Sequence, residues 1–390
     1  MLIPLSLVPS FGFGDRLGFA TPGHIAAARE TMFAPIFAQQ SVRENQRTGR
    51  TPQQVMDDAK RAVDSAQWDR PWGADADHLK TVEDISPFVE AGYTFFTIDP
   101  GEYVDNSADI DSLDILKQKA QSLNWEEAAT LYLHRNEEQA WGQFDAESLM
   151  RAVVKYGKSI RQVAAMYTRL SQMKNEFDFE VSVDETDSPT TPLEHYFIAS
   201  ELNRLGIRFT SLAPRFSGRF EKGVDYIGDL DALDAELGKH AAVTAHIGSY
   251  KLSLHSGSDK FSVYPLLAKH WGKRIHVKTA GTSYLEALRV LANHAPDLFL
   301  KIYALGCERY DIDKRTYHVS AQLDRLPSTD DLPSLLDDFH ARQMLHVTFG
   351  SALARFGAEL KETVVKYEAT YVEGLQAHFE KHLRFFQAQA

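Results

Sequence analysis

Charged side chains and histidines gather at several points along this 390-residue chain, each time at the end of a short apolar run. Runs of this kind end in polar clusters at residues 72–80, 93–99, 179–185, 251–260 and 274–279. Short apolar runs are typical of buried parallel strands. In α/β barrels the chemistry lies at the C-terminal ends of such strands. The repeated placement therefore predicts one shared site, and makes an enzyme the leading hypothesis.

The densest cluster holds Asp75, Asp77, His78 and Lys80. Carboxylate and neutral imidazole are suitable ligands for a divalent metal. Alternation along a strand would place Asp75 and Asp77 on one face and His78 on the other, unless a turn after the strand releases that constraint. A solvated loop with a helix cap explains this cluster equally well when it is taken alone.

Two later clusters add acids and imidazoles. Asp184 and Glu185 stand at an expected strand end, before a helix that opens at Thr191, so we favour a functional role for Glu185 over capping alone. His246 and His255 are nine residues apart and could both face a metal. A lone histidine is more often a core or surface residue.

The remaining candidates are suited to anions or carbonyl groups. Ser258 belongs to a Ser-Gly-Ser run whose hydroxyls and N–H groups suit an anion. Lys278 precedes a Gly-containing turn into a helix, where a carboxylate or phosphate can bind, and its amine could instead form a Schiff base. Arg43 could clamp a carboxylate, or lie in an exposed loop. The chain lacks a Walker loop, a Gly-x-Ser-x-Gly elbow and a convincing dinucleotide fingerprint, so no nucleotide cofactor is expected.

Strands alternate with helices in the elements that must position these groups. Strand candidates cover residues 14–20, 35–38, 298–303 and 344–348, and others start near Trp72, Tyr93, Phe177, Arg208, Ala241 and Arg274. This alternation predicts right-handed βαβ units and a parallel sheet. A (β/α)8 barrel needs eight strands, so two of the ten candidates are wrong or describe extra strands.

One segment interrupts the alternation. Residues 103–147 start with acidic side chains and then carry a helical pattern over residues 115–131, which predicts a helical insertion after an early strand, either a lid or a subunit contact. A helix with one apolar stripe follows over residues 149–170, and a long amphipathic helix is expected over residues 353–386. We expect residues 1–390 to form a single α/β barrel domain.

Composition restricts the partners and the compartment. The net charge of −12 argues against nucleic acid, since such binders usually carry a basic face. No run approaches the roughly 20 apolar residues that cross a membrane. The single cysteine, Cys307, permits no internal disulfide and fits a reducing compartment, so a cytoplasmic location is expected.

Several stretches taken together resemble the tagaturonate epimerase family of hexuronate catabolism. They are FGFGDRLG (11–18), ATPGH (20–24), QQSVRE (39–44), GADADHLKT (73–81), SVDET (182–186), HSGSDK (255–260) and HVKTAG (276–281). The combination is far more specific than any one motif, and it extends from near the N-terminus to about residue 350.

The resemblance implies a divalent-metal-dependent enzyme, with zinc, manganese, magnesium or nickel, that interconverts D-tagaturonate and D-fructuronate. These ketouronates differ at one hydroxyl-bearing carbon that is not adjacent to the ketone, so simple α-deprotonation does not invert it. Retro-aldol cleavage, rotation of the aldehyde fragment and re-addition do. A metal would stabilise the enediolate, and an acid/base pair would move the alcohol proton.

The family motifs also suggest roles for individual residues. Asp77 and Glu185 would form the acid/base pair. The metal ligands would be His78, His246 and His255, with Asp99 as a fourth. The substrate carboxylate and hydroxyls would bind to side chains with cationic or hydroxyl groups: Arg43, Lys80, Lys251, Ser258 and Lys278. The inserted segment and the final helix are the candidate contacts in a homo-oligomer.

Three alternatives stay open at this point. The chain could be an aldolase or isomerase that acts on another sugar acid, or an aldolase that uses a Lys278 Schiff base without metal. It could also be a non-catalytic barrel that binds a sugar acid, and such a binder would need neither a metal nor opposed acid/base groups.

Overall fold

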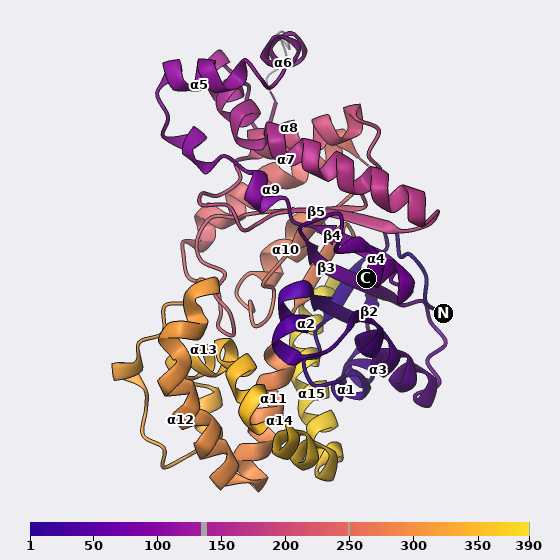
Figure 1. Ribbon diagram of the computed structural model, residues 1–390, viewed down its shortest axis with the longest axis vertical. Coiled ribbons are helices and arrows are strands. Elements are labelled where there is room, and N and C mark those ends of the chain that lie inside the picture. The colour runs from indigo at the N-terminus through magenta and orange to yellow at the C-terminus, as the bar shows by residue number, and fades with distance from the viewer. Residues whose placement is uncertain (134–138, 249, 390) are drawn as a thin grey trace.

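A closed barrel of eight parallel strands forms the centre of the computed structural model (Figure 1). The structure describes residues 1–133, 139–248 and 250–389. The strands follow one another around the barrel in chain order, and the last pairs with the first. They are β1 (Ser10–Phe13), β2 (Ala34–Ser41), β3 (Gly73–Leu79), β4 (Phe95–Ile98), β5 (Asp178–Val183), β6 (Ser211–Pro214), β7 (Lys251–Leu254) and β8 (Ile275–Thr279). The predicted (β/α)8 barrel is confirmed.

Helices surround the barrel. They are α1 (Thr21–Ala28), α2 (Val42–Thr48), α3 (Pro52–Ser65), α4 (Ile85–Glu90), α5 (Leu113–Ala120), α6 (Trp125–Tyr132), α7 (Ala146–Met173), α8 (Pro192–Arg204), α9 (Leu230–Ile247), α10 (Tyr264–Trp271), α11 (Thr282–His294), α12 (Pro296–Asp313), α13 (Phe339–Val347), α14 (Phe349–Lys366) and α15 (Glu368–Leu383). The cap predicted at Thr191 is present, because its hydroxyl accepts the N–H of Glu194 at 3.2 Å. Among the described residues, no helix is both long and apolar enough to cross a membrane.

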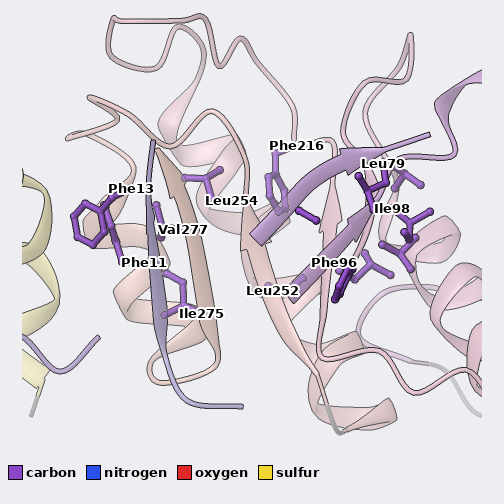
Figure 2. Close-up of a cluster of buried hydrophobic side chains, with 14 of the residues drawn as sticks. Phe11, Phe13, Leu79, Phe96, Ile98, Phe216, Leu252, Leu254, Ile275 and Val277 are labelled. Carbon is purple, nitrogen blue, oxygen red and sulfur yellow. The ribbon is translucent and has the colours of Figure 1, made fainter. Parts of the chain in front are cut away.

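The two faces of the barrel strands differ in polarity. Leu252, Leu254, Ile275 and Val277 belong to the apolar cluster outside β7 and β8 (Figure 2). The residues that alternate with them, such as Lys278, are buried polar groups that reach across the barrel to other strands. Because side chains alternate along a strand, this pattern places the apolar set under the helices and the polar set inside the barrel.

Two strand predictions are displaced. The first strand is Ser10–Phe13, whereas residues 14–20 form the connection to α1. The segment near Ala241 lies within α9, and the strand follows it at Lys251–Leu254.

Two further strand predictions are wrong. Residues 298–303 lie within α12, and residues 344–348 lie in α13 and at its C-terminal end. Both are short apolar runs buried on helices, and periodicity over so few residues does not distinguish a buried helix from a buried strand.

The segment between β4 and α7 is helical, as predicted, with α5 and α6 packed near α7. Two of its acidic side chains form ion pairs within the segment, because Lys119 contacts Asp105 at 2.8 Å and Asp111 at 2.6 Å. Residues 134–138 of the predicted insertion lie outside the described residues. The α5–α6 region and the α12–α14 region lie at opposite ends of the long axis (Figure 1).

The C-terminal segment differs from the prediction of one long helix. It breaks at Tyr367 into α14 and α15. The second of these packs closely on α1, where a Cβ atom added at Gly23 would lie 2.5 Å from Leu375 Cβ. This contact joins the end of the chain to its first barrel helix.

Candidate active site

A cavity of about 240 Å³ lies where the barrel strands end. Its walls include side chains that the sequence placed in separate clusters: Arg43, Asp77, His78, Glu185, His255, Ser258 and Lys278. The structure thus brings most of the predicted site residues to one place. Their convergence follows from the parallel barrel, which directs every strand end to the same face.

Lys278 occupies the centre of the site. Its Nζ lies 2.6 Å from Asp75 Oδ2, 2.8 Å from Asp77 Oδ1 and 2.9 Å from Glu180 Oε1, and it also donates to the Thr97 hydroxyl. Burial disfavours the ammonium, but the three carboxylates outweigh it and raise the pKa of Lys278. This lysine is therefore a cation rather than the neutral amine that a Schiff base requires.

Three buried carboxylates around one ammonium leave an excess of negative charge. Burial raises the pKa of Asp75 to about 7, against the opposing effect of Lys278. The pKa of Asp77 is held well below its usual range, because His78 and Lys278 outweigh the effect of burial. The site therefore favours the ionised form of Asp77 and shifts Asp75 toward its protonated form.

His78, Asp184 and His255 form a group of candidate metal ligands at the cavity. His255 Nδ1 lies 3.2 Å and His78 Nε2 lies 3.7 Å from Asp184 Oδ1. One ligand atom from each residue lies within 4.8 Å of the others. Two imidazoles and one carboxylate are a donor set that fits a divalent cation.

Carboxylates hold the other nitrogen of each imidazole. His78 Nδ1 lies 2.8 Å from Asp77 Oδ1, and His255 Nε2 lies 2.7 Å from Glu180 Oε1. Metal-binding histidines usually have such a partner, which fixes the ring and its tautomer. Burial lowers the pKa of both histidines, but neighbouring carboxylates, led by Asp77 for His78 and by Asp184 for His255, raise both above the usual value.

A β-bulge in β3 at His78 resolves the alternation problem noted in the sequence, because the pairing with β4 shifts register between Ala76 and Leu79. The backbone φ of His78 is +53°, in the left-handed region that non-glycine residues rarely occupy. The bulge allows Asp77 and His78 to contact each other and to line the same cavity. Such strained conformations persist mainly where the surrounding structure enforces them, often at functional sites.

The rim of the cavity carries a looser set of ion pairs. Glu185 lies 3.6 Å from Arg43 and 3.8 Å from Lys80, and it is about one-third exposed. Lys80 also contacts Asp99 at 3.1 Å. Asp99 belongs neither to the cavity wall nor to the candidate ligand group, so the structure does not support its prediction as a fourth ligand.

The prediction of His246 as a metal ligand is wrong in position. His246 lies in the last turn of α9, where its ring packs on Trp141 and Tyr196. Strand β7 separates it from His255, and a strand of four residues spans roughly 13 Å. The two histidines therefore lie toward opposite ends of the barrel.

Lys251 is misplaced for the same reason. It begins β7 and donates to the Val8 carbonyl and to the Ser10 hydroxyl, both at 2.9 Å. Burial lowers its pKa to about 8. Its predicted role in substrate binding is therefore wrong. Ser258, by contrast, lines the cavity, and its hydroxyl accepts the Ala280 N–H at 3.2 Å.

Some residues at the site were not predicted. Asp184 was named in its cluster without a role and Glu180 was not singled out, although alternation marks both, since Asp178, Glu180, Ser182 and Asp184 occupy every second position of one strand and its end. Lys222 lies in the loop after β6, where no pattern in the sequence marks it.

A second group with the same residue types lies between the loop after β7 and α15. It contains Asp259, His378 and His382, all buried, and none of them lines the cavity. Arg342 donates to Asp259 Oδ2 at 2.9 Å. The Asp259 N–H donates to His382 Nε2 at 3.0 Å, and His382 Nδ1 contacts the His378 carbonyl at 2.9 Å.

Comparisons with known proteins agree on one family. A family model described as tagaturonate epimerase matches residues 4–386. A Thermotoga maritima protein named tagaturonate/fructuronate epimerase is 43% identical over 383 residues, which cover 96% of this chain and 80% of that protein.

Solved structures give the same result. The native crystal structure of fructuronate-tagaturonate epimerase from Cohnella laeviribosi has a TM-score of 0.93 at 38% identity, covering 98% of this chain and 83% of that one. A complex of that enzyme with two glycerols has a TM-score of 0.94 at 37% identity, covering 99% and 83% of the respective chains.

Proposed function

Because the chain belongs to the tagaturonate epimerase family, a family of carbohydrate epimerases, we propose that it interconverts D-tagaturonate and D-fructuronate at the barrel-end cavity. One observation carries the proposal. His78, Asp184 and His255 present ligand atoms to one point, and the imidazoles are oriented by carboxylates that Lys278 holds. A barrel that only binds a sugar acid would not need this arrangement.

The proposed reaction is a retro-aldol cleavage followed by re-addition. A base takes the hydroxyl proton from the carbon to be inverted, and the C–C bond toward the ketone breaks. Its electron pair passes to the ketone half as an enediolate, and the other half becomes an aldehyde. The aldehyde turns over, the bond re-forms on its opposite face, and the alkoxide recovers a proton.

His78, Asp184 and His255 would hold a divalent metal, which supplies Lewis-acid stabilisation of the enediolate when it is bound. Two imidazoles favour zinc, manganese or nickel over magnesium, which prefers oxygen ligands. Asp77 and Glu180 position the rings, and Lys278 keeps these two carboxylates ionised and in place.

We propose that Asp77 and Glu185 move the hydroxyl proton. Both carboxylates line the cavity. Asp77 is fixed by Lys278 and His78, whereas Glu185 has only long ion pairs and can reorient toward a substrate. Glu185→Gln is expected to abolish turnover while ketouronate binding survives, as measured by steady-state kinetics and calorimetry. Near-normal turnover would remove Glu185 from the mechanism.

Two further features belong to this proposal. The single cysteine fits the reducing conditions of the cytoplasm, where we propose that the enzyme acts. The role of residues 103–147 as a lid or subunit contact stays a prediction.

The test is turnover of D-tagaturonate by the purified chain, before and after chelation, with each divalent metal added back. We expect conversion to D-fructuronate that chelation removes and zinc, manganese or nickel restores. Conversion that survives complete metal removal would contradict metal dependence. No conversion with any metal would contradict the epimerase assignment and favour another sugar acid or a binding role.

A further inference from the structure

Lys222 is a cation in the cavity wall, and no carboxylate partner for it is found among the described residues. It lies in the loop between β6 and α9, and its half-buried side chain donates to the Ser256 hydroxyl at 2.7 Å. Across the described parts of the chain, no carboxylate lies within 4.0 Å of its ammonium, whereas Lys278 in the same cavity has three. An ammonium has three donors, so two of them remain for a ligand.

Three other cations of the cavity wall, Arg16, Arg43 and Arg219, already have counter-charges, whereas Arg215 shares with Lys222 the lack of a carboxylate within 4.0 Å among the described residues. Arg16 lies 3.0 Å from Glu44, and Arg43 lies 3.6 Å from Glu185. Burial and the charge of Arg43 lower the pKa of Lys222, and the more distant Asp184 and Glu185 only partly offset this effect. An anion beside Lys222 would supply the charge that the protein does not.

The backbone holds Lys222 firmly on both sides. The carbonyl of Glu221 accepts from Lys260 Nζ at 2.8 Å, and the carbonyl of Gly223 accepts from Arg342 Nε at 2.7 Å. The Glu221 carboxylate accepts from Gln343 at 2.6 Å. The fold therefore fixes the position of this lysine independently of its own side-chain bond, which is what a preorganised binding group requires.

We propose that Lys222 binds the substrate carboxylate and thereby selects ketouronates over neutral ketohexoses. The inference rests on the proposed function and adds its carboxylate-recognition residue. In a six-carbon ketouronate the carboxylate lies at the end away from the ketone, so retro-aldol cleavage leaves it on the aldehyde fragment. That fragment must stay bound while it turns. An ammonium is a point charge with rotatable donors and permits this turning, whereas a bidentate arginine would fix the carboxylate plane.

The experiment compares wild type, Lys222→Met and Lys222→Arg with Lys158→Met, a matched change at an exposed lysine on α7. Rates are measured with D-tagaturonate and with the neutral ketose D-tagatose. For Lys222→Met we expect a loss of about 10- to 100-fold in kcat/KM for the ketouronate, the range of a charged hydrogen bond. We expect little change for the ketose, partial recovery in Lys222→Arg, and wild-type behaviour in Lys158→Met.

An unchanged ratio of ketouronate to ketose activity in Lys222→Met would overturn the inference while the proposed function stands. If wild type turns over neither ketouronate, the proposed function fails. The inference about Lys222 is then tested by measuring how tightly the ketouronate binds. Calorimetry with D-tagaturonate should then show affinity that Lys222→Met weakens about tenfold or more, and equal affinities would overturn it. A ketohexose 6-phosphate that binds more tightly than the ketouronate, and depends on Lys222, would also overturn the carboxylate assignment.

Discussion

Among the described residues, two groups each contain one aspartate and two histidines with ligand atoms within 4.8 Å, yet their chemistry differs. In the group at the cavity, carboxylates outside the group hold one nitrogen of each histidine, and the other nitrogens approach Asp184. In the group beside α15, the His382 nitrogen that faces Asp259 accepts the Asp259 backbone N–H, so its lone pair is already used, and Arg342 neutralises Asp259. Proximity alone therefore does not make a metal site. A nitrogen or oxygen that another protein group already occupies is not available to bind a metal.

The charges of the histidines differ in the same way. Carboxylates raise the pKa of His78 and His255 above the usual value, despite burial. Burial lowers the pKa of His378 and His382, despite the opposing effect of Asp259. The first pair holds positive charge that a divalent cation could replace, whereas the second pair is neutral and joins the C-terminal helix to the loop after β7.

The largest expected difference between the two groups is in turnover. His255→Ala should reduce kcat by more than the roughly 10- to 100-fold that loss of an outer-shell partner costs, because a ligand itself is removed. His378→Ala should retain most of the activity. Steady-state assays on both purified variants measure this. Similar losses in the two variants would contradict the assignment of the cavity group.

Lys278→Met is expected to have the next largest effect. It leaves Asp75, Asp77 and Glu180 without their buried cation, which should cost about 3 kcal/mol of unfolding free energy and also impair activity. Urea denaturation measures the stability. Lys251→Met is the matched control at the other end of the barrel, and it should cost less, about 2 kcal/mol, since neutral groups accept its hydrogen bonds and no carboxylate contacts its ammonium directly among the described residues.

Arg342→Met tests the second group directly. Removing this cation leaves Asp259 buried without its main partner and should lower the unfolding free energy by about 2 kcal/mol. Because the group is not at the cavity, bound metal should not change. Loss of metal together with unchanged stability would reverse the roles assigned to the two groups.

The smallest effect concerns pH. The pKa of His378 is lowered in the folded state, whereas it is about 6.5 in the unfolded chain, so the unfolded state binds more protons below that pH. Stability should therefore be full above pH 6.5 and fall as the pH drops below it. His378→Asn should reduce this slope in denaturation curves between pH 7 and 5. An identical slope would show that His378 does not titrate between the two states.

The sequence allowed the barrel and the meeting of the polar clusters to be predicted, since both depend on local alternation. Asp75 and Asp77, or Ser253 and His255, occupy every second position, and a parallel barrel directs such residues to one interior. The strand prediction at residues 298–303 is wrong because the local pattern there does not determine the structure. That run is apolar enough for a strand, and only its packing as a helix on the outside of the barrel decides between the two.

The site was predicted in part for related reasons. Asp77, His78, His255 and Lys278 lie at or just after strand ends and were found, whereas His246 was misassigned because a strand separates it from His255. Lys222 was missed because its importance comes from a missing counter-charge, and this depends on three-dimensional neighbours rather than on any motif.

The most direct test of the central claim is the metal content of purified wild type, His255→Ala and His378→Ala after incubation with zinc and desalting, measured by elemental analysis. The account predicts about one metal ion per chain in wild type and in His378→Ala, and little in His255→Ala. Metal that persists in His255→Ala but disappears in His378→Ala would contradict it, as would a metal-free wild type that still turns over D-tagaturonate.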